Sequence, residues 1–303
     1  MKWSNINEYF DDAELYLRLP LGTSMEIGIK VAPHHVEWKT LLQVAEVADE
    51  AEVFYQFWNF DHFYPINSDT NGPCLEAWVT LTGIAQATSR IRIGCMVNGV
   101  HYRHPAVLAN MASALDIVSE ARFELGLGAG WNELESGAYG IELGSLKERF
   151  DRFDEALTIV ASLLTQEKTS FTGEYFTLKD ARNEPKGPQQ PLPICIGGTG
   201  EKRTLRSVAR YASHWNLPIC EDQMFKQKYD VLKQHCEKAG TDIEDIKVST
   251  HVFIEEETQA SSVISEVHHQ NQLGIHQSIL YFQPPINMKQ VELLTEALTS
   301  EFH

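Results

Sequence analysis

Residues 26–59 read EIGIKVAPHHVEWKTLLQVAEVADEAEVFYQFWN. The apolar runs at 26–31 and 53–59 are typical of strands, and the segment at 40–51 between them repeats apolar residues at helical spacing. A strand, a helix and a second strand in succession indicate two parallel strands joined by a right-handed crossover. This stretch therefore predicts a β–α–β unit at the start of an α/β domain.

The same alternation continues to the end of the chain. Further strands are expected at 91–97, 122–128, 194–196, 214–219, 247–254 and 276–282, and further helices at 75–88, 105–119, 144–165, 201–212, 222–238, 258–272 and 287–300. Eight strand–helix units in about 280 residues are typical of a closed (β/α)8 TIM barrel. A doubly wound open sheet is the structural alternative.

One segment interrupts this rhythm, at residues 169–193, TSFTGEYFTLKDARNEPKGPQQPLP. It alternates apolar and polar residues and is rich in Gly and Pro, which predicts a hairpin-like insertion after the fourth strand–helix unit. Residues 1–24 lack the basic start and apolar centre of a signal peptide and are interpreted as an N-terminal extension. Residues 25–303 are expected to form the barrel domain.

The charge and the cysteines narrow the classes of function. The chain has 303 residues and a net charge of −17, which repels phosphate backbones and anionic lipids and argues against nucleic-acid or membrane partners. No apolar run approaches the ~18 residues of a membrane span. The five cysteines are an odd number without a C-x-x-C pair, which argues against a disulfide framework or a zinc site. We expect a cytoplasmic protein without a bound metal.

In a TIM barrel the reactive side chains lie on the loops that follow the strands. Asp61 and His62 follow the second expected strand, and Asn98, a candidate cofactor-binding residue, follows the third. Because an imidazole titrates near neutral pH, His62 is a candidate acid or base, with Asp61 as the carboxylate that orients it. The alternative is a purely structural Asp–His pair.

The loop after the fourth expected strand reads GLGAGWNE, at 126–133. Gly128 and Gly130 leave room at the strand end for a flat ring system, and Trp131 is placed to form one wall of such a site. Tyr139 follows closely in the chain and is a further candidate contact. The alternative is a tight turn with a packed tryptophan.

The loop after the fifth expected strand is rich in glycine. Gly197, Gly198 and Thr199 precede a helix whose first turns are basic and include Arg203. Glycine lets the backbone approach an anion, and the N–H groups at a helix start point toward it. The loop is therefore a candidate phosphate site, with an ordinary strand-to-helix turn as the alternative. It lacks the spacing of a P-loop, and the loop at 126–133 lacks the third glycine of a dinucleotide fingerprint.

Four stretches together resemble one known family. They are WNFDHFYPI (58–66), GPCLEAWVTLTGIAQATSRIRIG (72–94), YRHPAVLANMASALDIVSEARFELGLGAGWNELESGAYGI (102–141) and PICIGGTGEKRTLRSVARYASHWN (193–216). In order, spacing and loop identity they are similar to the bacterial luciferase-like superfamily of flavin- and deazaflavin-dependent oxidoreductases. The likeness is closest to the subgroup that uses the deazaflavin coenzyme F420 rather than FMN.

The resemblance implies a (β/α)8 barrel with an insertion, and it implies site residues. Asp61 and His62 match positions beside the cofactor ring, with His62 as the acid or base. Met96 and Val97 match a bulge of the third strand that backs the ring, where family members often have a non-prolyl cis peptide. The loop that begins at Gly197 matches the phosphate-binding loop.

Two departures from the family concern the substrate. The sugar-phosphate dehydrogenases of the superfamily have Trp and Glu at the positions that Ile66 and Trp131 occupy here. The resemblance therefore argues against a sugar-phosphate substrate for this chain.

The sequence thus predicts an oxidoreductase that moves a hydride between F420 and a small organic substrate. A first alternative is an FMN-dependent two-component monooxygenase, similar to alkanesulfonate monooxygenase, which needs a flavin reductase as its partner. A second alternative is a non-catalytic flavin-binding protein. A small molecule is the expected ligand, and a homodimer is the expected assembly.

Overall fold

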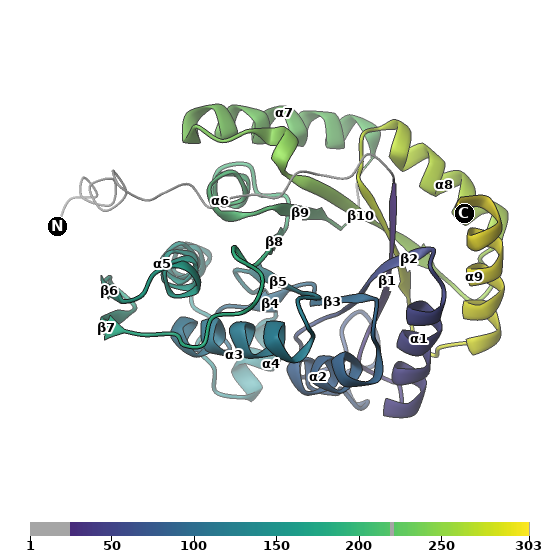
Figure 1. The fold of residues 1–303 in the computed structure, drawn as a ribbon, viewed down its shortest axis with the longest axis horizontal. Helices are drawn as coiled ribbons and strands as arrows, with labels where there is room; N and C mark the ends of the chain where they lie inside the picture. The colour runs from purple at the N-terminus through teal and green to yellow at the C-terminus, as the bar shows by residue number, and fades with distance from the viewer. Residues whose placement is uncertain (1–24, 219–220, 303) are drawn as a thin grey trace.

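Eight parallel strands form a closed barrel in the computed structural model, which describes residues 25–218 and 221–302 (Figure 1). The barrel strands are β1 (Glu26–Val31), β2 (Phe54–Asn59), β3 (Arg92–Cys95), β5 (Phe123–Gly128), β8 (Ile194–Gly197), β9 (His214–Leu217), β10 (Lys247–Ile254) and β11 (Gln277–Phe282). Each overlaps a strand expected from the sequence. The extension expected at 1–24 lies outside the described residues.

Pairing between β3 and β5 closes the barrel. Around the ring the strands follow the order β1, β2, β3, β5, β8, β9, β10, β11 and back to β1, and all these pairs are parallel. At the seam Gly94 lies opposite Glu124. The prediction of a (β/α)8 TIM barrel is confirmed, and the doubly wound sheet is wrong because such a sheet has two free edges.

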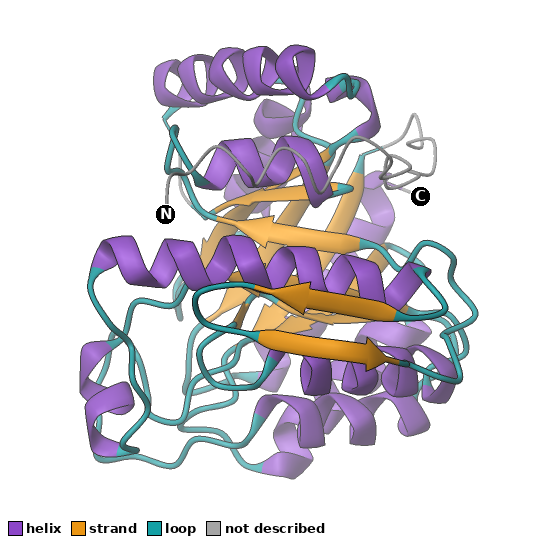
Figure 2. Cartoon of the chain, turned by 90° about the vertical axis from the view of Figure 1, so that its left-hand side faces the viewer, coloured by secondary structure: helices purple, strands orange, loops and turns teal. Residues whose placement is uncertain are grey.

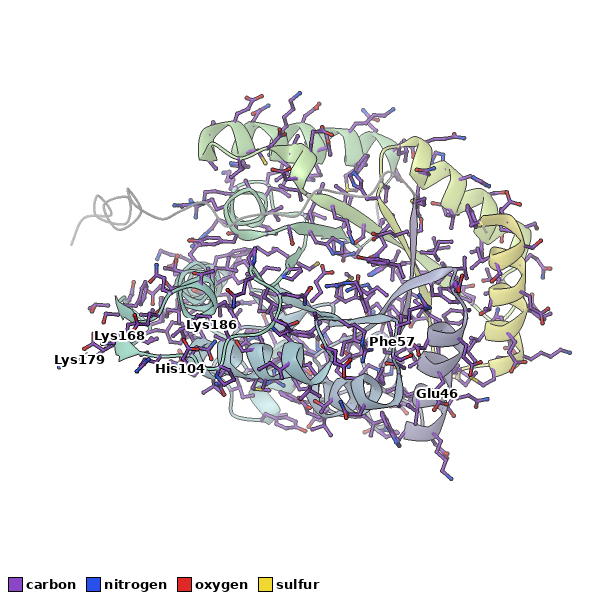
Figure 3. The ribbon with its side chains drawn as sticks, viewed as in Figure 1. Glu46, Phe57, His104, Lys168, Lys179 and Lys186 are labelled. Carbon is purple, nitrogen blue, oxygen red and sulfur yellow. The ribbon has the colours of Figure 1, made fainter. Side chains whose placement is uncertain are left out.

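Helices cover the outside of the barrel. They are α1 (Trp38–Glu50), α2 (Ala77–Ala87), α3 (Pro105–Val118), α4 (Glu133–Ala138), α5 (Leu146–Thr165), α6 (Thr204–Tyr211), α7 (Asp222–Ala239), α8 (Ala260–Gln272) and α9 (Met288–Phe302). Outward-facing strand residues such as Ile29 and Phe57 are fully buried beneath this layer, Phe57 on the side of α1 (Figure 3). Within the described part of the chain, no helix is long and apolar enough to cross a membrane.

The inner face of the barrel is polar toward the N-terminal ends of the strands. The Glu124 carboxylate accepts a hydrogen bond from Nδ1 of His214 at 2.5 Å and another from Gln56, and Nε2 of His214 contacts the Ser249 hydroxyl at 2.7 Å. The Cys195 sulfur lies within 4.8 Å of the ligand atoms of Glu124 and His214. Because both imidazole nitrogens are already hydrogen-bonded, we interpret the cluster as a structural network rather than a metal site.

Toward the C-terminal strand ends the interior becomes apolar. Trp58, Met96, Cys195 and Ile279 form one buried cluster, with Val97 packed against it. These residues come from β2, β8, β11 and the turn after β3. We call this cluster the mouth floor, because the loops at the C-terminal strand ends stand around it.

The insertion expected at 169–193 is present. β6 (Thr169–Thr172) and β7 (Thr177–Ala181) form an antiparallel hairpin that lies along α5, with Lys168 and Lys179 exposed at its outer edge (Figures 2 and 3). The Glu155 carboxylate on α5 accepts hydrogen bonds from the backbone N–H groups of residues 174–176 in the hairpin. These contacts hold the hairpin on the outside of the barrel.

Two short elements, β4 (Asn98–Gly99) and α4, have no counterpart among the expected elements. The strand expected at 91–97 ends at Cys95, and β4 pairs instead with β5. The helix α4 begins after Asn132, whose side chain accepts hydrogen bonds from the N–H groups of Leu134 and Glu135. An asparagine cap is a usual helix start, but six residues are too few for helical periodicity to show.

Gly126 permits the close approach of backbone at the barrel seam. A Cβ atom there would lie 1.9 Å from the carbonyl oxygen of Cys95, so the backbone would have to move. We expect Gly126→Ala to lower the free energy of unfolding by ~1–3 kcal/mol, the usual cost of overpacking a core. Denaturant unfolding monitored by circular dichroism measures this change.

The matched control is Gly137→Ala in α4, where nothing lies within 4 Å of the added atom. Alanine there should raise the free energy of unfolding by ~0.5–1 kcal/mol, because glycine weakens a helix interior. Equal effects of the two substitutions would contradict the role of Gly126 at the seam.

Candidate active site

The predicted site residues lie on loops that are neighbours around the barrel. These loops follow β2, β3, β5 and β8, which are consecutive in the closed strand order. We call the C-terminal ends of these four strands, with their loops, the first half-rim. The structure thus brings the sequence-predicted loops together on one side of the mouth.

His62 is held by a carboxylate that the sequence analysis assigned no role. The Nδ1–H of His62 donates a hydrogen bond to Oε1 of Glu135 at 2.5 Å, and the imidazole packs edge-on against the ring of Trp131. The His62 side chain is 11% exposed. No described residue hydrogen-bonds its Nε2 atom, so this nitrogen is available to a ligand at the mouth.

Glu135 is the buried anchor of this arrangement. Its carboxylate is fully buried and also accepts hydrogen bonds from the backbone N–H of Phe63 at 2.8 Å and from the Tyr102 hydroxyl. Burial alone would raise the pKa of Glu135, but the hydrogen bonds from His62 and Tyr102 outweigh it and the pKa is lowered. The carboxylate is therefore ionised and fixes Nδ1 of His62 as the donor nitrogen.

Asp61 does not orient His62, so that part of the prediction is wrong. Its carboxylate instead forms a two-pronged ion pair with Arg103, at 2.6 and 3.0 Å, and Arg103 also contacts Glu76 at 2.6 Å. Burial raises the pKa of Asp61 in spite of the neighbouring guanidinium. The loops after β2 and β3 bring the opposite charges of Asp61 and Arg103 together. The two residues are 42 positions apart in the chain, so no local motif predicts this pair. Asp61 ties the loop after β2 to the loop after β3.

The turn after β3 lies where the resemblance placed the bulge. The Met96–Val97 peptide is cis, as the resemblance implied. A Cβ atom added to Gly128 would lie 2.7 Å from Cγ2 of Val97, and one added to Gly130 would lie 2.4 Å from the His101 ring. The prediction that these glycines leave room for a ring therefore needs correction, because Val97 and His101 occupy that space.

Asn98 stabilises the same turn through hydrogen bonds of its side chain. Its side-chain oxygen accepts a hydrogen bond from the indole N–H of Trp78 at 2.7 Å, and its amide nitrogen donates to the Gly126 carbonyl at 2.7 Å. The residue is fully buried. Because both ends of the amide are engaged, the side chain acts on the shape of the turn rather than directly on a ligand.

Two aromatic residues of the loop after β5 stand at the surface of the first half-rim. Trp131 is 56% exposed, and its ring packs edge-on against that of His62. Tyr139 is also exposed, and its ring stacks on that of Phe63 with the ring centres 4.7 Å apart. Tyr139 thereby braces the segment that follows His62.

The glycine loop after β8 has a fixed backbone shape. Gly198 has φ +124°, and its carbonyl accepts a hydrogen bond from the indole N–H of Trp215 at 2.9 Å. Its own N–H donates to the Asn216 carbonyl. Gly197 and Thr199 beside it are partly exposed. The loop therefore presents backbone and small side chains at the mouth.

Arg203 does not stand free beside this loop, so its predicted contribution needs correction. Its guanidinium forms ion pairs with Asp151 at 2.6 Å and Asp154 at 2.5 Å, both on α5. These carboxylates neutralise the positive charge that the sequence pattern indicated. Arg203 joins α6 to α5, so the loop presents its backbone rather than a free guanidinium.

Two further histidines, His34 and His101, lie near His62, and both are neutral at pH 7. Burial and the neighbouring histidines lower the pKa of His34 to about 4, and its ring is stacked on Phe60. Burial likewise lowers the pKa of His101 to about 4. Nε2 of His101 contacts the Ser136 hydroxyl at 3.2 Å.

A sequence model of the Luciferase-like monooxygenase family matches residues 21–279, and the chain belongs to this family. An F420-dependent hydroxymycolic acid dehydrogenase of Mycobacterium tuberculosis is 33% identical over 192 residues, which are 62% of this chain and 52% of that protein. An F420-dependent glucose-6-phosphate dehydrogenase of Amycolatopsis mediterranei is 29% identical over 230 residues, 73% of this chain and 66% of that protein. The chain thus spans about half to two thirds of the length of these relatives.

The fold is also found among solved structures. That of an F420-dependent secondary alcohol dehydrogenase, in complex with an F420-acetone adduct, has a TM-score of 0.82. The alignment covers 91% of this chain and 98% of that chain at 19% sequence identity. At this identity the likeness shows the shared barrel fold.

The buried Glu135 carboxylate should be required for stability. We expect Glu135→Gln to lower the free energy of unfolding by ~1–3 kcal/mol, because the donors around it lose a charged acceptor. The control Glu133→Gln, on the same helix but with a side chain 81% exposed, should change it by less than ~0.5 kcal/mol. Urea unfolding at neutral pH compares the two variants.

The same carboxylate predicts a dependence on pH. Since the folded pKa of Glu135 lies below its ordinary value of 4.5, its contribution is complete above pH 4.5 and is lost as the pH falls below it. The difference in stability between wild type and Glu135→Gln should therefore shrink on acidification. A difference that stays constant from pH 7 to below pH 4.5 would contradict this account.

Proposed function

We propose that this chain is an oxidoreductase that transfers a hydride between coenzyme F420 and a small organic substrate. The observation that carries the proposal is the 2.5 Å hydrogen bond from Nδ1 of His62 to the buried Glu135. It leaves Nε2 of an ordered imidazole without a hydrogen-bond partner among the described residues, on the loop where the family resemblance places the acid or base. The names of the two F420-dependent dehydrogenases described above support the same cofactor.

Several features of the structure fit such a cofactor. The mouth floor, with Trp58, Met96 and Val97, offers an apolar surface for one face of a ring. Gly198 is held at φ +124°, a conformation that excludes ordinary side chains and leaves backbone to meet a phosphate. We infer that Gly197 and Thr199 also contact the phosphate, and that Trp131 forms the outer wall of the cofactor site.

The cofactor supplies two-electron hydride chemistry when bound, and the protein manages the proton. In carbonyl reduction, the Nε2–H of His62 gives its proton to the substrate oxygen while the hydride reaches the carbon. In alcohol oxidation, Nε2 takes that proton. Glu135 stabilises the ring in the orientation and protonation state that this exchange needs.

The substrate we propose is a small alcohol, aldehyde or ketone rather than a sugar phosphate. Ile66 and Trp131 replace the Trp and Glu that the resemblance associates with sugar-phosphate dehydrogenases. We further infer a cytoplasmic location, because no disulfide bond joins any two of the described cysteines, as is usual in reducing compartments.

The test is anaerobic turnover. Purified protein is mixed with reduced F420 and a panel of small aldehydes, ketones and unsaturated carbonyl compounds. The proposal predicts that at least one compound restores the absorbance of oxidised F420.

The family description favours a monooxygenase as the second candidate. Oxygen uptake with reduced FMN and a flavin reductase, together with inert reduced F420, would establish that candidate instead.

His62 provides the sharper test of mechanism. We expect His62→Ala to lower kcat by ~10²–10⁴-fold, the usual contribution of general acid–base catalysis, with little change in F420 affinity. The control His268→Ala removes an exposed imidazole on α8 that pairs with Glu301, and should leave kcat unchanged. Steady-state kinetics and melting temperatures are measured for both variants. A normal kcat with a lowered melting temperature would assign His62 a structural role. Absence of turnover by the wild type with every acceptor, despite binding of the cofactor, would favour a non-catalytic flavin-binding protein.

A further inference from the structure

The ends of the remaining four strands form the other side of the mouth. They are β9, β10, β11 and β1, and we call them the second half-rim. Lys30, the fifth of six residues in β1, lies beside Tyr281 of β11 and Trp58 of β2 in the strand register. Its neighbours Ile29 and Val31 belong to the outer core, so Lys30 faces the barrel interior next to the mouth floor.

Lys30 is an unusual residue for this position. It is 6% exposed, and its ammonium lies 4.5 Å from the centre of the Tyr281 ring. Among the residues that the structure describes, no carboxylate pairs with this ammonium and no side chain hydrogen-bonds to it. A buried charge without a counter-ion costs several kcal/mol, and proteins normally pair or neutralise it. A buried cation in the barrel interior beside the mouth floor therefore points to an anionic ligand.

Within residues 25–218 and 221–302, the surroundings of Lys30 offer no charge that could replace a ligand. The titratable groups that interact electrostatically with Lys30 or lie against it are His251 on β10, Tyr281 on β11, Cys95 on β3 and Cys195 on β8. Burial raises the pKa of both thiols, raises that of Tyr281 to about 12 and lowers that of His251, so all four are neutral at pH 7. Burial also lowers the pKa of Lys30 to about 8, which leaves it mainly protonated at pH 7.

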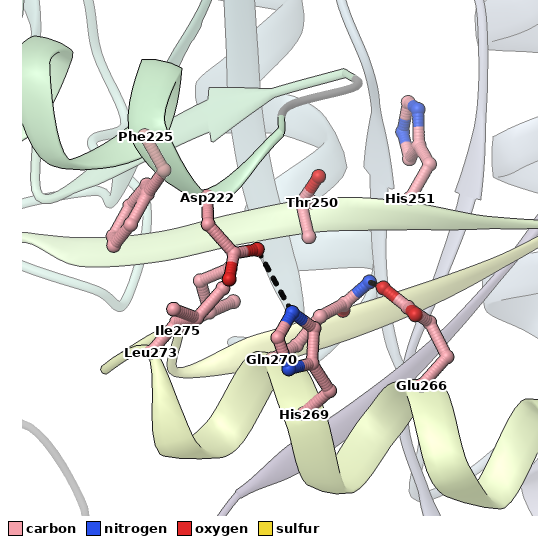
Figure 4. Close-up of a pocket in the computed structure, with 9 residues that line it drawn as sticks. All are labelled: Asp222, Phe225, Thr250, His251, Glu266, His269, Gln270, Leu273 and Ile275. Carbon is pink, nitrogen blue, oxygen red and sulfur yellow. Dashed lines mark hydrogen bonds and ion pairs between the residues drawn. The ribbon is translucent and has the colours of Figure 1, made fainter.

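A neighbouring cavity does not serve the same purpose. It measures about 260 Å³ and lies between the start of α7 and the side of α8 (Figure 4). Asp222, paired with His269, and Glu266 line it together with His251. Two carboxylates in its wall oppose the entry of an anion, so the anion would meet Lys30 from the mouth.

We infer that Lys30 is a substrate-binding residue that pairs with a carboxylate of the substrate in the second half-rim, opposite the cofactor loops. This inference rests on the proposed function, because only an enzyme has a substrate for Lys30 to bind. It narrows the substrate class to small carbonyl or alcohol compounds that also carry a carboxylate. The ammonium would hold the acid group over Tyr281, and His62 of the first half-rim would meet the reacting oxygen.

The test uses acetate, hexanoate and benzoate as probes, each compared with its neutral primary amide. Dissociation constants are measured by calorimetry on the whole protein, with and without F420. Wild type should bind at least one carboxylate about tenfold or more tightly than its amide, as expected for a desolvated charge-assisted contact. Lys30→Met should abolish this preference. Lys168→Met, which removes the same charge from the outer hairpin, should retain it.

A second readout needs no variant. Because Lys30 loses its proton near pH 8, the preference of wild type for carboxylate over amide should fall as the pH rises through about 8. Equal binding of acid and amide by wild type in all three pairs would overturn the inference, as would a preference that survives in Lys30→Met or is unchanged above pH 8. Failure of F420 to bind would overturn the proposed function alone, since the titrations without F420 still report on Lys30.

Discussion

One buried carboxylate, that of Glu135, organises the candidate active site. It collects hydrogen bonds from the loop after β2, through His62 and the N–H of Phe63, and from the loop after β3, through Tyr102. A carboxylate removed from water is stable only when its oxygens are satisfied, so these three donors and the first turn of α4 must assemble together. The position of the imidazole follows from that requirement. The site is therefore a consequence of one satisfied buried charge.

A second constraint is the packing of backbone at the barrel seam. Cys95 and Val97 lie so close to β5 that only glycine fits at positions 126 and 128 without displacement of its neighbours. This packing fixes the position of the mouth floor relative to β5, and the loops of the first half-rim surround the mouth floor. The second half-rim carries a different chemistry, with the ammonium of Lys30 over Tyr281 and no ion-pair partner for it in the described part of the chain. We propose that the first half-rim binds the cofactor and that the second binds the substrate.

The sequence predicted what depends on local pattern. Alternating apolar runs gave the eight strands, their order and the hairpin at 169–193, because strand and helix periodicity is visible within each segment. Pairs of distant side chains were not predictable in the same way. Asp61 lies next to His62 in the chain yet binds Arg103, and Arg203 lies next to the glycine loop yet binds Asp151. The partners are set by loop geometry, which no short motif encodes. The helix α4, which carries Glu135, has only six residues, too few for helical periodicity to show in the sequence.

The central claim, that the mouth is built for a deazaflavin, is tested most directly by a binding measurement on the purified protein. F420 and FMN are titrated separately and followed by quenching of fluorescence. The account predicts saturable binding of F420 with a dissociation constant at least about tenfold lower than that of FMN. Tighter binding of FMN, or no binding of F420, would contradict it.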